Sequence, residues 1–285
     1  MRAETPRWDY FTALLSKNPP QTGTGHSLAP GLPEASLSRA AYKLRRKYLK
    51  EFQKRKILDL ALEDEAAGCF YACHICTSYS PRQICVLRPE KPALCGLYDF
   101  RTAQVIARLE PWGPFRKVEK GRCLNPENGE WEGVNRYLQQ NTGGKIKRSL
   151  PYSLLEEPEP VCSCAQVIAA FIPEAQGFML VNREYRGETP LGMDFAALLE
   201  YLRSAEATPG FAGLARSYLK SPRFLKAEGG LSRLVWLPAS LKRAFGSKAL
   251  LPPEPGPREV KTLPQLLAYL KKVGHPVLTM ENLLK

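Results

Sequence analysis

From residue 69 onward, apolar and polar positions follow patterns typical of short strands mixed with helices. Two short apolar segments predict strands: GFMLVNREY (177–185) and SRLVWLP (232–238). Two segments with apolar residues at helical spacing predict helices: FAALLEYLRSA (195–205) and TLPQLLAYLKKVG (262–274), the second ended by Gly274. The segment QVIAAFIP (166–173) fits either a helix or a buried segment. These patterns predict an α/β fold with a mixed sheet and flanking helices.

The first 66 residues have a different pattern. Residues 18–36 are rich in Pro, Gly, Ser and Thr and predict a linker. Residues 39–56 (RAAYKLRRKYLKEFQKRK) contain nine Lys or Arg and one acidic residue, and Leu44, Tyr48 and Phe52 recur every four positions. That spacing predicts an amphipathic basic helix. The sequence therefore predicts an N-terminal extension over residues 1–66, made of a linker and a short basic helix, followed by one domain over residues 67–285.

Composition is ordinary for a globular protein, with 44% hydrophobic and 24% charged residues in a chain of 285. Apolar runs are too short for a membrane span, and the N-terminus has no apolar signal core. We therefore expect a cytoplasmic protein without a membrane partner. The formal net charge of +13 predicts attraction to something anionic: nucleic acid, an acidic protein or a phosphorylated cofactor. Charge alone does not choose among them.

Eight cysteines without a secretory signal favour metal or redox chemistry over a disulfide framework. Four of them form the spacing C-x2-C-x8-C-x9-C: Cys73, Cys76, Cys85 and Cys95. Four thiolates are the usual complement of an iron-sulfur cubane, and they also suit zinc. On these residues alone, both metals remain open. Cys69 and Cys123 lie outside the spacing, and we expect them to be simple buried thiols.

The tripeptide Cys162-Ser163-Cys164 has a more selective chemistry. Its two sulfurs, with the backbone nitrogens of Ser163 and Cys164, can lie in one plane around a single ion. Nickel(II) favours square-planar nitrogen and sulfur ligands, whereas zinc has no such preference. Both thiolates also retain lone pairs with which to bridge to a second metal. The tripeptide therefore favours nickel.

The quartet followed at a distance by C-x-C resembles the metal-binding domain of acetyl-CoA synthase, a component of the carbon monoxide dehydrogenase/acetyl-CoA synthase complex. Three further stretches are similar to the same domain: 173–193, 208–242 and 274–284. The resemblance covers roughly residues 69–285. It implies a fold with an A-cluster, which consists of a 4Fe-4S cluster joined to a proximal and a distal nickel ion.

The resemblance also implies a role for each matched residue. Cys73, Cys85 and Cys95 are expected to hold three irons, and Cys76 the fourth iron and the proximal nickel. Cys162 and Cys164 are expected to bridge the two nickel ions, with the Ser163 and Cys164 amide nitrogens completing the distal site. In the family, carbon monoxide, a methyl group from a corrinoid iron-sulfur protein and coenzyme A combine at the proximal nickel, so the resemblance implies an acyltransferase.

This chain departs from the family at three points. The family commonly has Gly where Ser163 stands and Phe where Tyr79 stands beside the proximal nickel, so we expect Tyr79 to line the catalytic site. Relatives also carry further domains ahead of the cluster domain. The resemblance therefore implies a minimal form that relies on carbon monoxide dehydrogenase or on another chain for the missing domains.

Two other hypotheses remain open beside the catalytic one. The chain could be a relative that only holds or delivers the cluster, or transfers a methyl or carbonyl group. It could instead be a zinc-stabilised basic module that binds nucleic acid, although no aromatic-interleaved motif supports this. The basic helix is either a solvated face or a site for phosphates of coenzyme A or for an acidic partner, with these candidate residues: Arg45, Arg46 and Lys50.

Overall fold

The computed structural model describes residues 62–78, 80–202, 206–245 and 260–284. The chain divides into two units after Leu58, and all described residues belong to the second, Asp59–Lys285. The domain boundary predicted after residue 66 stays a prediction. The predicted basic helix (39–56) and the predicted linker (18–36) lie outside the described residues. None of the described helices has the length and apolar character of a membrane span.

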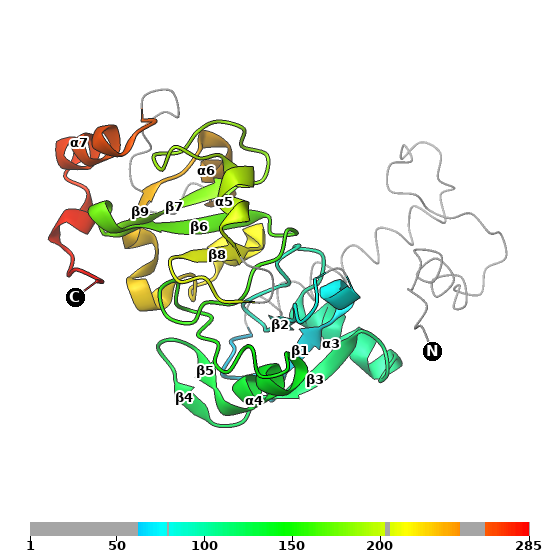
Figure 1. The fold of residues 1–285 in the computed structure, drawn as a ribbon. Helices are drawn as coiled ribbons and strands as arrows, with labels where there is room; N and C mark the ends of the chain where they lie inside the picture. The colour runs from blue at the N-terminus through cyan, green and yellow to red at the C-terminus, as the bar shows by residue number, and fades with distance from the viewer. Residues whose placement is uncertain (1–61, 79, 203–205, 246–259, 285) are drawn as a thin grey trace, which may run out of the picture. The chain divides into compact units, whose positions relative to one another are not determined.

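A three-stranded antiparallel sheet in the order β2-β1-β3 carries the first part of the described chain (Figure 1). Its strands are β1 (Cys69–Cys73), β2 (Cys85–Leu87) and β3 (Phe115–Glu119). Helices α3 (Phe100–Leu109) and α4 (Glu132–Asn141) pack against it, and a small sheet follows β3: β4 (Cys123–Asn125) with β5 (Glu130–Trp131). A hydrophobic cluster fills the space between the sheet and the helices, and it buries both faces of β1.

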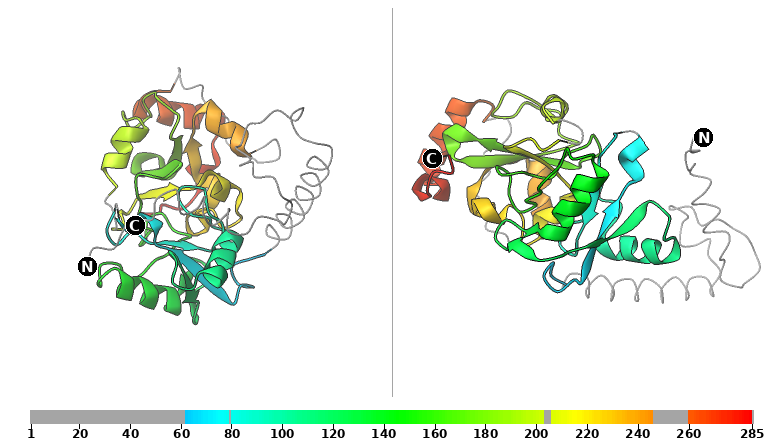
Figure 2. Two further views of the ribbon diagram at one scale, coloured as in Figure 1. Left: turned by 90° about the vertical axis from the view of Figure 1, so that its right-hand side faces the viewer. Right: turned by 60° about the horizontal axis from the view of Figure 1, so that its bottom comes forward.

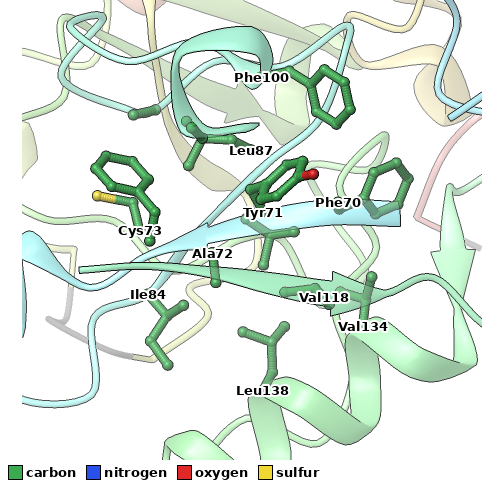
Figure 3. Close-up of a cluster of buried hydrophobic side chains, with 14 of the residues drawn as sticks. Phe70, Tyr71, Ala72, Cys73, Ile84, Leu87, Phe100, Val118, Val134 and Leu138 are labelled. Atoms are coloured by element: carbon green, nitrogen blue, oxygen red, sulfur yellow. The ribbon is translucent and has the colours of Figure 1, made fainter. Parts of the chain in front are cut away.

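Figure 3 shows how this cluster surrounds β1. The Cys73 side chain lies on the same side of the strand as Leu87 and Phe100, and Leu138 of α4 lies on the other side. Each of these apolar side chains is at least 93% buried, so β1 is held rigidly by packing on both faces. This packing therefore fixes the position of Cys73, the first cysteine of the quartet.

A second, mixed sheet has the order β8-β6-β7-β9, seen from further directions in Figure 2. Its strands are β6 (Val167–Ile172), β7 (Gly177–Asn182), β8 (Phe211–Leu214) and β9 (Leu234–Trp236), of which β7 and β9 pair in parallel. Alternate residues of β6 enter two different hydrophobic clusters. One cluster includes α6 (Ala239–Phe245), and the other includes α5 (Phe195–Glu200) and α7 (Leu263–Val273).

The predicted fold class is confirmed, since the described chain is an α/β mixture with a mixed sheet and flanking helices. The predicted helix at 262–274 is α7, with a capping box at Thr262 and Gly274 in the left-handed region at φ +61°. The predicted strands are present as β7 and β9. The undecided segment 166–173 is the strand β6, and the helix predicted over 195–205 is shorter, ending at Glu200.

Four short 3-10 helices complete the described connections around the second sheet: η3 (Pro173–Ala175), η4 (Arg216–Lys220), η5 (Lys226–Glu228) and η6 (Gly230–Arg233). Two others lie at the ends of the described domain: η2 (Ile75–Ser78) after β1 and η7 (Pro276–Thr279) after α7. Of these, η2 matters most for the candidate site, because it carries Cys76 directly behind β1.

Candidate metal centre

Four segments of the chain hold the four cysteines of the quartet. Cys73 ends β1 and pairs across the antiparallel ladder with Cys85, the first residue of β2. Cys76 lies in η2, where its carbonyl accepts a hydrogen bond from the Ser80 amide. Cys95 lies in a turn closed by the bond from the Gly96 amide to the Ala93 carbonyl. The ladder between β1 and β2 thus brings two predicted ligands that are distant in sequence to neighbouring positions.

The thiols of this quartet influence one another electrostatically. Burial raises the pKa of Cys73 above its ordinary value, and the neighbouring Cys85, Cys76 and Cys95 raise it further. Burial raises the pKa of Cys85 to about 12, and Glu159 and the other thiols add to the shift. Burial and Cys95 together raise the pKa of Cys76. Because burial and neighbouring thiols disfavour the charged forms of Cys73, Cys76 and Cys85, a bound cation would stabilise their thiolates.

The Cys162-Ser163-Cys164 tripeptide forms a tight turn that leads directly into β6. The Ala165 amide donates to the Cys162 carbonyl at 3.3 Å, which closes the turn around Ser163 and Cys164. The sulfurs of Cys162 and Cys164 are in direct contact as a disulfide pair, and the two Cα atoms lie 5.4 Å apart. Both sulfurs therefore lie on the same side of the turn.

The residue on β8 beside this turn is Gly213. A Cβ on Gly213 would lie 2.5 Å from Val161 and 2.8 Å from Ala165, the residues that flank the tripeptide. The missing side chain thus lets the turn approach the sheet closely. The Gln166 amide also donates to the Leu214 carbonyl of β8 at 3.1 Å. The tripeptide is fixed to the second sheet at both ends.

One pocket of about 370 Å³ joins the two cysteine segments. Its lining residues come from η2 and Ser80 beyond it, from the turn before β6, and from α5 and the residues after it: Cys76, Ser80, Val161, Cys162, Ser163, Cys164, Leu199 and Leu202. The structure therefore brings Cys76, just after the first sheet's β1, together with the tripeptide that leads into β6 of the second sheet. The predicted bridging role of Cys76 requires these residues to lie close together.

Among the described residues, no three histidine, cysteine, aspartate or glutamate side chains stand close enough together to hold one metal ion. A cubane takes its four thiolates at four separate corners, so its ligands do not have to converge on one point. A closed tetrahedral zinc site does need four donors around one ion. The quartet's four thiols supply the number and kind of donors that either group takes.

A buried ion pair, which the sequence did not indicate, connects the two cysteine segments. The Lys91 ammonium lies 2.6 Å from the Glu159 carboxylate, three residues before Cys162, and Arg88 lies 3.6 Å from the same carboxylate. Arg88 also pairs with Asp64 at 2.8 Å. Burial lowers the pKa of Lys91, and the Glu159 charge opposes this shift. These cations follow β2, so the pairs hold the tripeptide segment against the first sheet.

A buried hydrogen bond reinforces this connection. The Gln83 side-chain amide donates to the Pro160 carbonyl at 3.2 Å. Gln83 lies between Cys76 and Cys85, and Pro160 lies just before Cys162. The bond therefore joins the segment between Cys76 and Cys85 to the segment just before Cys162. Such contacts between distant segments leave no spacing pattern, so only the structure reveals these residues.

Several predicted residues lie elsewhere or outside the described part. Tyr79, Arg45, Arg46 and Lys50 lie outside the described residues, so their roles stay predictions. Cys123 was expected to be buried, and this is wrong: it is exposed, because β4 belongs to the two-stranded sheet and points its side chains outward. Cys69 is partly buried, and its thiol lies 3.6 Å from the Tyr71 hydroxyl.

Comparison with known proteins gives a consistent result. A family model that describes the C-terminal part of the ACS/CODH beta subunit matches residues 52–250. The acetyl-CoA decarbonylase/synthase complex subunit beta of Methanopyrus kandleri is 37% identical over 238 residues, which are 82% of this chain and 50% of that protein. The complex subunit beta 2 of Methanocaldococcus jannaschii is 38% identical over 230 residues, which are 79% of this chain and 49% of that protein.

The similarity extends to a bacterial protein. The carbon monoxide dehydrogenase/acetyl-CoA synthase subunit alpha of Moorella thermoacetica is 33% identical over 235 residues, which are 78% of this chain and 32% of that protein. Among solved structures, the C-terminal domain of the acetyl-Coenzyme A synthase alpha subunit matches with 35% identity and a TM-score of 0.38, over 43% of this chain and 98% of that chain. The chain spans half or less of the length of these curated relatives.

Proposed function

Because this chain belongs to the family of the C-terminal domain of the ACS/CODH beta subunit, we propose that it holds an A-cluster and takes part in acetyl-CoA synthesis or cleavage. The reaction is the joining of carbon monoxide, a corrinoid-borne methyl group and coenzyme A, or its reverse, as an acyltransferase of the CO-methylating type. One observation carries the proposal: Cys76 lines the same pocket as Cys162, Ser163 and Cys164. Zinc and nucleic-acid binding give no reason for that meeting.

The proposal gives each donor a role. Cys73, Cys85 and Cys95, together with Cys76, would hold a 4Fe-4S cluster. Cys76 would also share the proximal nickel with the tripeptide, whose Ser163 and Cys164 nitrogens would bind the distal nickel. When bound, the nickel supplies the organometallic step that joins carbon to carbon.

The protein itself contributes position, access and a dry surround. The antiparallel ladder between β1 and β2 fixes Cys73 against Cys85, and the packing of β1 prevents that pair from moving apart. The apolar side chains of Val161, Leu199 and Leu202 line the pocket and exclude water from one side of it. A site with little water protects reactive carbon groups from hydrolysis and strengthens the electrostatic interactions inside it.

Substrates and partners belong to the proposal as well. The relatives are named as subunits of complexes, and the chain spans half or less of their length. We therefore expect a corrinoid iron-sulfur protein, carbon monoxide dehydrogenase or a chain with the remaining domains as partners. Tyr79 would line the substrate position, and Arg45, Arg46 and Lys50 would attract coenzyme A phosphates or an acidic partner.

Anaerobic reconstitution of the full chain with iron, sulfide and nickel tests this function. Metal analysis should find iron and nickel bound together. Cys73→Ala should lose the iron-sulfur absorption, because it removes a corner ligand. Cys164→Ala should keep iron and lose nickel, because it removes a sulfur and disturbs the planar donor set. Cys123→Ala is the matched control, since this thiol is exposed on β4, and it should bind both metals normally.

The reaction is tested separately from the metals. Reduced, nickel-loaded protein should exchange labelled carbon monoxide into the carbonyl group of acetyl-CoA when the corrinoid partner is supplied. Binding of both metals without exchange would leave a cluster carrier or a partial reaction as the function. Zinc bound without iron or nickel after reconstitution would overturn the proposal and leave the zinc-stabilised module.

A further inference from the structure

We propose that Arg183 is a positioning residue that makes the Cys162-Ser163-Cys164 turn selective for nickel over zinc. The Arg183 guanidinium donates a hydrogen bond to the Ser163 carbonyl oxygen, at the centre of the turn. This inference rests on the proposed function, because it concerns the same tripeptide. It goes beyond that function by assigning the metal selectivity to a side chain outside the cysteine pattern.

Two contacts hold Arg183 in place beside the turn. Its backbone amide, directly after β7, donates to the Gln166 carbonyl at 3.0 Å, which fixes its Cα next to the end of the tripeptide segment. Its guanidinium carbon lies 5.8 Å from the centroid of the Phe195 ring at the start of α5, a cation–π arrangement. Arg183 is exposed, and its guanidinium is directed to the Ser163 carbonyl oxygen.

That oxygen belongs to the peptide group whose nitrogen is the Cys164 amide. In the planar donor set that we propose, this nitrogen would bind nickel as an anion, after giving its proton to water. The peptide group is conjugated, so the negative charge is shared with the Ser163 carbonyl oxygen. A guanidinium that donates to this oxygen therefore stabilises the nickel-binding form of the peptide by a charge-assisted hydrogen bond.

The same contact has an orienting effect. In a trans peptide the C=O bond and the N–H bond point to opposite sides. By holding the Ser163 oxygen on the side of Arg183, the guanidinium keeps the donor side of the Cys164 nitrogen directed away from Arg183. Zinc gains nothing from this arrangement, because it takes thiolate, imidazole or carboxylate ligands and has no preference for a plane. The effect of Arg183 should therefore separate the two metals.

The test measures the affinity of the full, reduced, anaerobic chain for nickel(II) and for zinc(II), by competition with a chelator. Arg183→Gln should weaken nickel binding by about tenfold to hundredfold, the range for loss of a hydrogen bond to a charged group. Zinc binding should change by less than about twofold, since no such bond is lost. Arg183→Lys should recover part of the nickel affinity, because it restores the positive charge without the planar fork.

Arg186→Gln is the matched control, an exposed arginine three positions further along, and it should bind both metals as the unaltered chain does. Equal losses for nickel and zinc in Arg183→Gln would indicate a merely structural role and overturn the inference. Unchanged nickel affinity in Arg183→Gln would overturn it as well, while leaving the proposed function intact. No nickel binding by the unaltered chain would overturn the proposed function itself, and the inference with it.

Discussion

The Lys91 ammonium lies 2.6 Å from the Glu159 carboxylate, with only 3% and 13% of the two side chains exposed. Lys91 follows β2, which carries Cys85, and Glu159 precedes the Cys162 turn. The pair therefore joins the two cysteine segments in a water-poor part of the protein. A buried pair of this kind is costly to break, because the partner that remains keeps an uncompensated charge.

Glu159→Leu alone should lower the free energy of unfolding by about 3–5 kcal/mol, because it leaves the Lys91 ammonium buried and unpaired. Urea unfolding of the variant and of the unaltered chain measures this change. The loss falls on Lys91, because Glu159 is its ion-pair partner among the described residues, whereas Arg88 keeps Asp64 as a partner.

The double variant Lys91→Met with Glu159→Leu provides the control. Two apolar side chains of similar size should restore most of the lost stability, since replacing a buried pair as a unit is nearly neutral. A double variant that loses as much as the two single variants added together would contradict the coupling.

Gln83→Met should lower the free energy of unfolding by about 1–3 kcal/mol, because the Pro160 carbonyl would lose its buried donor at similar side-chain volume. Thermal and urea unfolding check the change. Gln140→Met is the comparison, an exposed glutamine on α4, where a shift within about 0.5 kcal/mol is expected. Equal effects at both positions would mean that the bond to Pro160 does not hold the segments together.

The sequence predicted the elements with clear periodicity, and it left β6 undecided for a physical reason. All six residues of β6 are buried, because the strand lies in the middle of its sheet and packs against a hydrophobic cluster on each face. A strand buried on both faces has no alternation of apolar and polar residues, so its pattern is not distinguishable from that of a buried helix.

For the candidate site, the roles of the individual thiols stay predictions. Cysteine spacing and family resemblance indicated which thiols belong together, and the pocket brings Cys76 to the Cys162 turn as that grouping requires. The residues that hold the segments in place were not predictable. Glu159 and Arg183 act through contacts between distant parts of the chain, and such contacts follow from the pairing of whole elements rather than from local spacing.

Gly96→Ala should destabilise the turn that holds Cys95 by more than the cost of backbone strain alone. Gly96 has φ +70°, and a Cβ there would lie 2.5 Å from the Gln166 side-chain oxygen. Gln166 does not move aside freely, because this oxygen accepts a hydrogen bond from the Arg216 amide at 2.8 Å. We expect a loss of about 2–5 kcal/mol, made of left-handed backbone strain and overpacking.

Gly143→Ala separates these two causes. Gly143 has φ +64°, and a Cβ there would meet nothing within 4 Å, so only the backbone strain of about 1–2 kcal/mol is expected. Urea unfolding of the two variants gives the difference, which is the cost of crowding Gln166. Equal losses would show that Gln166 yields, and that the Cys95 turn tolerates a side chain at position 96.

His275 should make the protein less stable as the pH falls below 6.5, the ordinary histidine value. Burial lowers the pKa of His275, and its Nδ1 accepts the Val277 amide at 3.1 Å while Nε2 lies 3.1 Å from the Leu234 carbonyl. Nδ1 accepts only in the neutral ring, so Nε2 donates. Protonation would place a second donor against the Val277 amide.

The sign follows from these contacts. The unfolded chain binds a proton more readily than the folded one, so the stabilisation is complete above about pH 6.5 and is lost as the pH falls through the lowered folded pKa. Thermal unfolding from about pH 8 to 5.5 should therefore show a decline of up to about 1.4 kcal/mol per pH unit for each histidine of this kind. His275→Gln should be less stable at pH 8 but decline less steeply, while His74, whose pKa burial and Arg116 also lower, keeps its share. An unchanged pH dependence of stability in His275→Gln would assign the decline to other groups. A contribution of His275 that increases stability as the pH falls would mean that His275 is charged in the folded protein.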